Sequence, residues 1–283
     1  MIMRPIAISG FSDEICADFN GQLDYINQLG ISHIEIRGVD GKNISDLTDE
    51  EVSGVKELLA LHSVKVSSIG SPIGKIGIKE DFEEHFDKFK RVVEISKALD
   101  TPYIRMFSFF IPEGEKPENY RQEVLSRLKK LVNYARHEGV ILLHENEKDI
   151  YGDTAQRCLD IMNQLNCDNF KAVFDFANFV QVGENTLNAY MALRPFIEYV
   201  HIKDAIGRDV VPAGMGDGNV KEILAFLQLN NYGGYLSLEP HLSGFEGFSS
   251  LEKGDSEKPF SDGKFSWAVA LHALKSILYD LKW

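Results

Sequence analysis

Four residues that can bind a metal ion each close a short apolar run in the second half of the chain. They are Glu145, Asp175, His201 and Glu239, separated by 30, 26 and 38 residues. Each interval has about the length of one strand, one helix and their loops. Continuous apolar runs are typical of parallel strands buried on both faces, and an acid that ends such a run is costly to bury alone. The pattern predicts that the four side chains meet at the carboxyl ends of four parallel strands and hold one divalent cation.

The residue types indicate which ion and which reaction this group would serve. Three carboxylates and one imidazole suit Mn2+, the ion that we favour, and also Mg2+, Co2+ or Zn2+. Carboxylates this close together would repel one another without a cation between them. A cation that held the carbonyl and hydroxyl oxygens of a sugar or polyol ketone would acidify the intervening C–H and stabilise the enediolate formed on deprotonation.

Glu145 and Glu239 are the expected acid/base pair. They close the fifth and eighth predicted strands, three positions apart in a ring of eight, and would flank a bound ketone from nearly opposite sides. One glutamate would take a proton and the other would return one. Return to the opposite face of the same carbon is epimerisation, and transfer to the neighbouring carbon is aldose–ketose isomerisation.

Eight apolar runs alternate with eight helical patterns along the chain. The first four predicted strands cover residues 6–9, 33–36, 64–69 and 103–106, and the other four end in the metal-binding residues. Gly30 and Gly139 end two of the predicted helices, and Thr48, followed by three acids, begins another. Strict alternation favours a parallel sheet, and eight units favour a closed barrel over an open, doubly wound sheet. We therefore predict an α/β fold, a (β/α)8 TIM barrel, with residues 1–283 as a single domain.

One segment interrupts this rhythm. Residues 242–263 form a long stretch that is rich in Gly and Ser and contains three phenylalanines. Long segments without regular structure are usually functional or disordered. Because this one follows the last predicted strand, we expect it near the active-site mouth, either as a lid or subunit contact or as a mobile surface insertion.

Composition and charge restrict the partners. The formal net charge of −13 argues against nucleic acid or an anionic membrane surface as the main partner. The sequence has no run of 18 apolar residues and no signal-peptide pattern, and its three cysteines follow no disulfide or metal spacing. We expect a cytoplasmic protein that binds a small sugar or polyol ketone and does not span a membrane. A homo-oligomer is compatible with the sequence.

Three motifs resemble a known family. They are Tyr-Val-His-Ile-Lys-Asp at 199–204, Pro-Ala-Gly-Met-Gly-Asp-Gly at 212–218 and Tyr-Gly-Gly-Tyr-Leu-Ser-Leu-Glu-Pro at 232–240. They look like the xylose isomerase-like TIM barrels, and more narrowly the sugar phosphate isomerase/epimerase group, which includes ketose 3-epimerases, hydroxypyruvate isomerase and inosose dehydratase. In that group the equivalent Glu, Asp, His and Glu bind the metal and the two glutamates exchange the proton. The resemblance implies the same roles for the four residues named above.

Two positions depart from the family pattern. Ketose epimerases usually carry a His three residues after the metal-binding Asp, where this chain has Asn178. An amide can bind a sugar hydroxyl but cannot titrate. Relatives often read Glu-Asn-His at the end of the fifth strand, where this chain has Glu147 in place of the His. Glu147 is either a further acid at the site or a solvated turn residue, and we favour the turn.

Three further residues are candidates for substrate binding, together with Asn178. Arg208 follows the metal-binding His by seven residues, close to where epimerases carry a substrate-binding Arg. Lys203 would share a strand face with that His, where it could hold a hydroxyl, carboxylate or phosphate, or pair with a nearby acid. His241, two residues beyond Glu239, could also reach the mouth.

The sequence leaves other functions open. The main alternative is a metal-dependent dehydratase of inosose or 3-dehydroshikimate type, which would expel a β-hydroxyl after the same deprotonation. A DNA-repair endonuclease of the same superfamily would need a histidine-rich trinuclear zinc cluster, and a non-catalytic sugar-binding barrel need not keep all four ligands. We favour a divalent-metal-dependent isomerase or epimerase of a sugar or sugar phosphate. The glycines at 214–218 are expected to turn the chain past the mouth rather than to cradle a phosphate.

Overall fold

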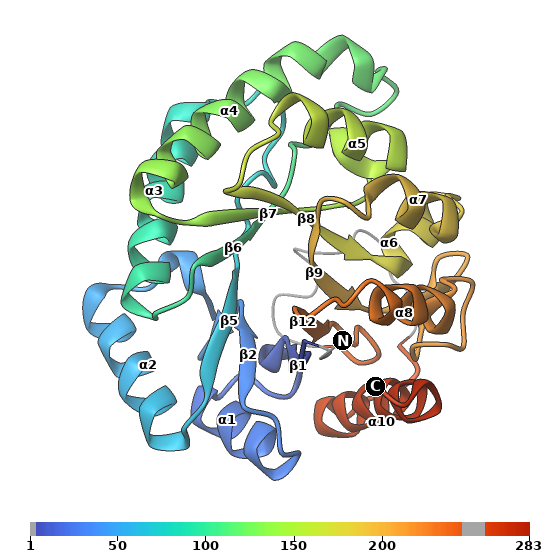
Figure 1. The fold of residues 1–283 in the computed structure, drawn as a ribbon. Helices are drawn as coiled ribbons and strands as arrows, with labels where there is room; N and C mark the ends of the chain where they lie inside the picture. Colours follow the sequence, from blue (N-terminus) through green and yellow to red (C-terminus); the bar gives the residue numbers. More distant parts are fainter. Residues whose placement is uncertain (1–3, 245–257) are drawn as a thin grey trace.

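Eight parallel strands form a ring in the structure, a computed structural model that describes residues 4–244 and 258–283, and helices surround this ring (Figure 1). The strands are β1 (Ala7–Gly10), β2 (His33–Ile36), β5 (Lys65–Gly70), β6 (Tyr103–Met106), β7 (Ile141–Glu145), β8 (Phe170–Asp175), β9 (Ile197–Ile202) and β12 (Tyr235–Leu238). These bounds lie within one or two residues of the predicted ones. The predicted TIM barrel is therefore confirmed.

The order of the strands closes the ring. Hydrogen-bonded neighbours run β1-β12-β9-β8-β7-β6-β5-β2, and every ladder is parallel. The two strands at the ends of that order, β1 and β2, meet through a parallel bridge between Phe11 and Glu35. An open, doubly wound sheet would leave its end strands as separate edges. That alternative is therefore wrong, and the carboxyl ends of all eight strands face one mouth.

The helices begin and end largely where the sequence predicts. They are α1 (Phe19–Gln28), α2 (Asp49–His62), α3 (Phe82–Ala98), α4 (Arg121–Glu138), α5 (Ala155–Gln164), α6 (Phe176–Gln181), α7 (Thr186–Leu193), α8 (Val220–Leu229) and α10 (Gly263–Leu281). Thr48 forms a capping box at the start of α2, and Gly139 ends α4 with a φ of 74°. The short helix α6 was not predicted, because it follows β8 without an intervening loop.

Several short elements build the loops beyond the carboxyl ends of the strands. They are the 3-10 helices η1 (Ser12–Glu14), η2 (Ile44–Asp46), η3 (Pro117–Tyr120) and η4 (Tyr151–Asp153), and the hairpins β3 (Gly38–Val39) with β4 (Lys42–Asn43) and β10 (Asp204–Ile206) with β11 (Asp209–Val211). The sequence did not predict these elements, which shape the walls of the mouth.

Two groups of side chains fill the barrel and its surroundings. The larger lies between the helices and the outer face of the sheet and includes the fully buried Trp267 of α10. Inside the ring, Leu143, Val173 and Tyr199 form a second cluster, and the Tyr199 hydroxyl lies 2.8 Å from Ser67 Oγ. The interior is therefore packed below the mouth, as expected of a barrel of eight strands.

The loop at 212–218 wraps around one buried carboxylate. Asp204 accepts hydrogen bonds from the backbone N–H groups of Gly214, Gly216 and Gly218 at 2.9, 3.0 and 2.9 Å. A Cβ on Gly216 would lie 2.4 Å from the carbonyl oxygen of Ala205, so a larger residue cannot approach in this way. These glycines turn the chain, as the sequence suggests, and their amides are already used.

The predicted lid lies largely outside the described residues. Of the stretch 242–263, the structure describes only the two ends, where Leu242 is buried and Ser243 pairs with Phe260 in a short bridge. A lid or subunit contact in this segment therefore stays a prediction. The three cysteines are free thiols. Across the described ranges, none of the helices has the length and apolar character needed to cross a membrane.

Candidate metal centre and active site

The four predicted metal ligands converge at the mouth of the barrel. Glu145 and Asp175 are the last residues of β7 and β8, His201 lies near the end of β9, and Glu239 directly follows β12. One ligand atom of each lies within 4.8 Å of the others, and all four side chains are buried. Parallel strands in a closed ring therefore bring together residues that are up to 94 positions apart in the sequence. We call these four residues the metal group.

His201 directs one ring nitrogen into the metal group and the other away from it. Its Nδ1 lies 3.0 Å from Glu145 Oε1, 3.9 Å from Glu239 Oε2 and 4.0 Å from Asp175 Oδ2. Its Nε2 lies 3.0 Å from Oε2 of Glu35, a buried residue of β2. Burial alone would lower the pKa of His201, but Glu145 and Glu35, one at each ring nitrogen, raise it well above its usual value. A cation in the metal group would replace the proton on Nδ1, while Glu35 would keep the proton on Nε2.

Buried cations hold the two glutamates from their other sides. Arg105 of β6 donates to Glu145 Oε2 at 3.0 Å. Arg37, just beyond β2, donates to Glu239 Oε1 at 3.2 Å, and Lys203 Nζ donates to Glu239 Oε2 at 2.8 Å. Each glutamate is therefore fixed in orientation by charge-assisted hydrogen bonds.

These contacts set the ionisation of the carboxylates. Burial alone would raise the pKa of Glu145, but His201 and Arg105 outweigh it and lower that pKa. Burial opposes nearby cations in the same way at Glu239, whose pKa is well below its usual value. At Asp175, burial is the larger effect and raises the pKa. Glu145 and Glu239 are therefore held as carboxylates that can accept a proton, whereas Asp175 lacks enough positive charge around it.

The metal group fits a divalent cation. Asp175 is fully buried, and no group in the described part of the chain donates a hydrogen bond to its Oδ2, although Lys203 Nζ lies 3.3 Å away. Carboxylate oxygens and an imidazole nitrogen are ligands that Mn2+, Mg2+ and Zn2+ accept. A cation among them would lower the pKa of Asp175 and remove the conflict between three close carboxylates.

Three of the four predicted substrate-binding residues lie beside the metal group, and all three are buried. Lys203 contacts Glu239, as described above. Asn178 Nδ2 donates to Glu145 Oε1 at 3.3 Å, since the first turn of α6 brings the amide back over β7. His241 Nε2 lies 3.4 Å from Glu239 Oε1. Their contact with a substrate stays a prediction.

Arg208 and Glu147 lie elsewhere than the sequence suggested. Arg208 is exposed in the turn between β10 and β11 and does not join the buried charges, so its role in substrate binding is a prediction without structural support. Glu147 is buried, and its Oε2 lies 3.1 Å from Lys75 Nζ. The expectation of a solvated turn residue at Glu147 is therefore wrong, because the loop after β5 places a lysine against it.

Sequence reasoning missed the roles of four buried charged residues, Glu14, Glu35, Arg37 and Arg105. Three of them lie at the carboxyl ends of β2 and β6, namely Glu35, Arg37 and Arg105. A search for charged residues that close apolar runs, which identified the metal group, could therefore have identified them too. Glu14 lies in η1, where no pattern marks it. It accepts from Arg37 at 3.1 Å and from the backbone N–H of His241 at 2.7 Å.

Glu14, Glu239 and His241 form a second group whose ligand atoms also lie within 4.8 Å of one another. Arg37 lies 3.1 Å from Glu14 and 3.2 Å from Glu239, so a guanidinium already supplies the positive charge there. The metal group, in which Asp175 keeps an oxygen without a hydrogen bond, is therefore the better candidate for a cation.

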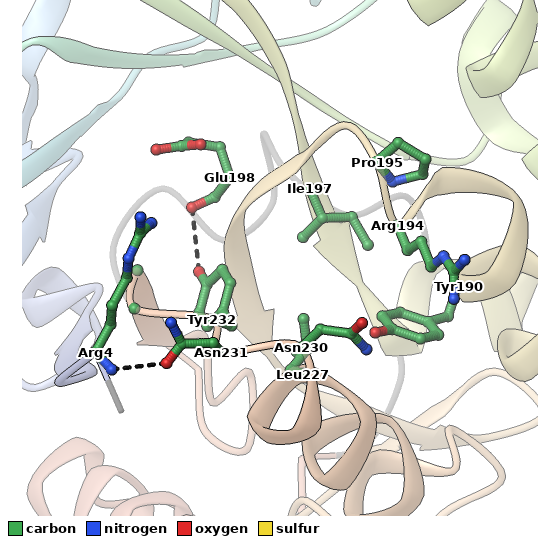
Figure 2. Close-up of a pocket in the computed structure, with 12 residues that line it drawn as sticks. Arg4, Tyr190, Arg194, Pro195, Ile197, Glu198, Leu227, Asn230, Asn231 and Tyr232 are labelled. Atoms are coloured by element: carbon green, nitrogen blue, oxygen red, sulfur yellow. Dashed lines mark hydrogen bonds between the residues drawn. The ribbon is translucent and has the colours of Figure 1, made fainter. Parts of the chain in front are cut away.

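A separate cavity of about 460 Å³ opens near the amino-terminal ends of β9 and β12 (Figure 2). Arg4, Arg194 and Tyr232 line it, and the Tyr232 hydroxyl donates to the Glu198 carbonyl at 3.1 Å. TIM-barrel enzymes carry their active sites at the opposite, carboxyl end of the barrel. None of the lining residues belongs to the two acid–histidine groups found in the described residues. The metal group is therefore a better candidate for the reaction site than this cavity.

This chain belongs to the xylose isomerase-like TIM barrel family, whose model matches residues 23–264. The matched span includes all four residues of the metal group. The family resemblance seen in the sequence is therefore confirmed.

Two curated relatives are enzymes of different reaction classes. A 3-dehydroshikimate dehydratase of Bacillus anthracis is 22% identical over 196 residues, which cover 68% of each chain. An inosose isomerase of Halalkalibacterium halodurans is 24% identical over 228 residues, which cover 77% of this chain and 80% of the relative. The relatives are thus isomerase and dehydratase enzymes.

Solved structures agree on the fold. A D-allulose 3-epimerase from Methylomonas sp. has a TM-score of 0.76 at 17% identity, with 98% of this chain and 100% of that chain covered. A xylose isomerase-like TIM barrel protein from Mycobacterium smegmatis, solved in complex with magnesium, has a TM-score of 0.70 at 17% identity and the same coverage. At this identity the similarity establishes the architecture.

Proposed function

We propose that this protein is a divalent-metal-dependent isomerase or epimerase of a sugar or polyol ketone, in which Glu145 and Glu239 exchange the substrate proton. The observation that carries the proposal is the buried metal group, with one ligand atom of each residue within 4.8 Å of the others. The inosose isomerase and the D-allulose 3-epimerase among the similar proteins support the reaction class. Mn2+ is the ion that we favour, with Mg2+, Co2+ or Zn2+ as alternatives.

The metal group would hold the cation, which supplies Lewis-acid polarisation of the substrate carbonyl when it is bound. Glu145 and Glu239 have lowered pKa values, so each is ready to accept a proton. They approach from β7 and β12, three steps apart in the ring. Lys203 Nζ lies 2.8 Å from Glu239. Burial alone would lower the pKa of Lys203, but Asp175 and Glu239 raise it well above its usual value, so the lysine keeps its proton and orients the glutamate. One glutamate removes the proton beside the carbonyl and becomes a carboxylic acid. That acid returns the proton to the neighbouring carbon of the enediolate, or the other glutamate, protonated from solvent, delivers a proton to the opposite face.

Neutral groups beside the glutamates would position the substrate hydroxyls. Asn178 Oδ1 is buried and accepts no hydrogen bond from the described residues. It can therefore accept one from a sugar hydroxyl while Nδ2 of the same amide stays bonded to Glu145. A fixed acceptor of this kind orients the reacting carbon toward the acid/base pair.

A dehydratase is the second candidate, favoured by the 3-dehydroshikimate dehydratase among the relatives. It would begin with the same deprotonation and then lose a β-hydroxyl group. A departing hydroxide needs a proton donor. Asn178 cannot serve as one because an amide does not titrate, so a glutamate of the acid/base pair would have to supply that proton. The endonuclease alternative is not supported, since each acid–histidine group of the described residues contains a single histidine.

Proton–deuterium exchange tests the proposal. Protein loaded with Mn2+ is incubated in D2O with a panel of ketoses, inososes and hydroxypyruvate. The expected result is deuterium on a carbon beside the carbonyl, with or without net conversion. The appearance of an enone or diketone absorbance without such exchange would instead establish the dehydratase.

Variants then test the acid/base pair. We expect Glu239→Gln to lower the exchange rate by about 10²-fold or more. The matched control is Glu198→Gln. Glu198 lies near the amino-terminal end of β9, away from the metal group, and accepts a hydrogen bond from Tyr103. This variant should catalyse deuterium exchange at the wild-type rate. Exchange at the wild-type rate in both Glu145→Gln and Glu239→Gln would remove the basis of the mechanism.

A further inference from the structure

The mouth of the barrel contains more buried acids than buried bases. Its acids are Glu14, Glu35, Glu145, Glu147, Asp175 and Glu239, and its bases are Arg37, Arg105 and Lys203. With one divalent cation and Lys75, which pairs with Glu147, the positive charges about balance these acids, and burial raises the pKa of Glu14 to about 8. An added anion would therefore find no excess of positive charge among the described residues to offset the cost of its burial.

Each of these bases already has a carboxylate partner. Arg37 lies 2.8 Å from Asp13 and 3.2 Å from one acid/base glutamate. Arg105 and Lys203 contact the two acid/base glutamates at 3.0 and 2.8 Å. A substrate phosphate or carboxylate would have to take a base away from its partner. That exchange leaves a carboxylate buried without its counter-charge, which is costly.

Protonation of the acids would not release a base. Burial raises the pKa of Glu14 to about 8 and also raises the pKa of Asp175. If both were protonated, Arg37 would still have Asp13, and Lys203 would still have its glutamate partner. Among the buried residues that the structure describes, each base at the mouth therefore keeps a carboxylate partner whatever the ionisation of these two acids.

The backbone amides of the glycine-rich loop at 212–218 do not supply an anion site either. Glycine-rich loops can bind phosphate through their N–H groups. In the loop at 212–218, however, Asp204 takes the amides of Gly214, Gly216 and Gly218. This loop is therefore filled by an acid of the chain itself.

The polar groups that remain suit hydroxyls. Asn178 Oδ1 and Arg105 Nε are both buried and make no hydrogen bond within the described part of the chain. One is an acceptor and the other a donor, and the charge of Arg105 is matched by Glu145. A hydroxyl can bond to either atom without adding charge to the site.

We propose that the site takes an uncharged polyol or sugar ketone and discriminates against a ketone that carries a phosphate or carboxylate. This inference rests on the metal-dependent function proposed above and narrows its substrate class. It also assigns a role to Glu147, which neutralises Lys75 at the rim of the mouth. Lys75 Nζ lies 3.1 Å from Glu147 Oε2 and 4.4 Å from the centroid of the Phe107 ring. Without Glu147, Lys75 would be a cation able to receive an anionic group.

Matched ligand pairs test the proposal on the wild-type protein. The first pair is D-ribulose and D-ribulose 5-phosphate, whose phosphate is remote from the carbonyl and its neighbouring hydroxyls. The second pair is scyllo-inosose and 3-dehydroshikimate, a neutral and an anionic ring. Dissociation constants are measured by calorimetry on the Mn2+-loaded protein. We expect the neutral member to bind about tenfold tighter or more, and equal or tighter binding of either anionic member overturns the proposal.

The outcome separates this inference from the proposed function. Tighter binding of the neutral ligands without deuterium exchange supports the charge preference and contradicts the isomerase or epimerase. Exchange confined to an anionic ligand supports the isomerase or epimerase and contradicts the charge preference. If neither member of either pair binds, both proposals are overturned.

A series of variants tests the role of the ion pair between Lys75 and Glu147 at the rim of the mouth. Glu147→Gln should raise the affinity for D-ribulose 5-phosphate about tenfold and leave that for D-ribulose unchanged, because it leaves Lys75 without its carboxylate. Adding Lys75→Gln to that variant should remove the gain, and the control Glu198→Gln should change neither affinity. An unchanged affinity for the phosphate in Glu147→Gln would overturn the role of this pair.

Discussion

The carboxylate of Glu35 acts on the metal group through His201. It bonds Nε2 at 3.0 Å and so fixes the tautomer that directs Nδ1 toward the carboxylates. In Glu35→Gln the amide can donate to Nε2 and favour the wrong tautomer. We expect this variant to bind Mn2+ about 10–100-fold more weakly, the usual effect of losing a carboxylate behind a histidine ligand. Titration of the metal-free protein with Mn2+ measures this directly.

Ser237 provides the matched control for Glu35. Its hydroxyl donates at 2.7 Å to Glu35 Oε2, the same oxygen that His201 Nε2 approaches. Ser237→Ala should therefore change the Mn2+ affinity by less than about threefold, since the carboxylate keeps its bond to the ring. An affinity that is equal in Glu35→Gln and the wild type would show that the carboxylate does not orient the histidine.

At the scale of single residues, the sequence predicts the metal group better than its partners. Glu145, Asp175 and Glu239 each interrupt an apolar run, and this local signal needs only the period of the fold. The bond between Glu35 and His201 joins residues 166 positions apart, across the interior of the ring. Such pairings depend on the curvature of the sheet and on side-chain length, which a strand pattern does not contain.

At the scale of elements, the loop after β5 is fixed by its contact with the loop after β6. Gly74, at its turn, has a φ of 88°, and a Cβ there would lie 2.1 Å from the Phe107 carbonyl oxygen. Gly74→Ala would therefore add both a strained backbone and a clash with main chain. We expect it to lower the free energy of unfolding by more than about 2 kcal/mol, measured by urea denaturation.

Gly114 separates these two effects, because its φ is 76° but a Cβ would meet nothing within 4 Å. Gly114→Ala should cost about 1 kcal/mol from backbone strain alone. A loss in Gly74→Ala no larger than in Gly114→Ala would show that the loop can move away from Phe107. The position of Lys75 at the rim would then not be fixed by this contact.

His85 of α3 makes the stability of the loop after β5 depend on pH. His85 Nε2 accepts from the Gly74 N–H at 2.8 Å, which requires a neutral ring, and burial lowers its pKa from 6.5 to about 4. Between these values the unfolded chain binds a proton that the folded chain does not. The His85 contribution to stability is therefore present above pH 6.5 and is lost as the pH falls toward 4.

His85→Gln keeps a neutral acceptor and removes the titration. As the pH is lowered from 6.5 toward 4, the wild type should lose up to about 3 kcal/mol more of its free energy of unfolding than this variant does. Denaturation at a series of pH values, with Mn2+ held constant, measures the difference. A difference between the two proteins that does not change with pH would mean that the ring is not kept neutral.

The elements themselves were largely predictable, and their exceptions share a cause. Strands and helices carry periodic apolar residues and end at marked positions such as Thr48 and Gly139. Helix α6 and the hairpin β10–β11 are too short to show a period. The start of α6 is capped by the side chain of Asp175, which accepts a hydrogen bond from the Asn178 N–H at 2.8 Å. Such a contact is visible only in the three-dimensional structure.

At the scale of the molecule, one bound cation would link several strands of the ring. Its ligands come from β7, β8, β9 and the end of β12, and Glu35 links β2 to the same histidine. The junction between β1 and β2 is a single bridge that includes Glu35. Binding of the metal should therefore stabilise the closed barrel as a whole.

Thermal unfolding measures that stabilisation and identifies the group that binds the cation. At a free Mn2+ concentration of about 100 times the dissociation constant, the folded state gains about 2.7 kcal/mol, which corresponds to a rise in Tm of roughly 4–5 °C for a chain of this length. Asp175→Asn should abolish this rise, because it removes a ligand carboxylate. Glu14→Gln should retain it, because Glu14 belongs to the second acid–histidine group, where Arg37 already supplies the charge. A rise that survives Asp175→Asn and disappears in Glu14→Gln would instead place the cation in the second group.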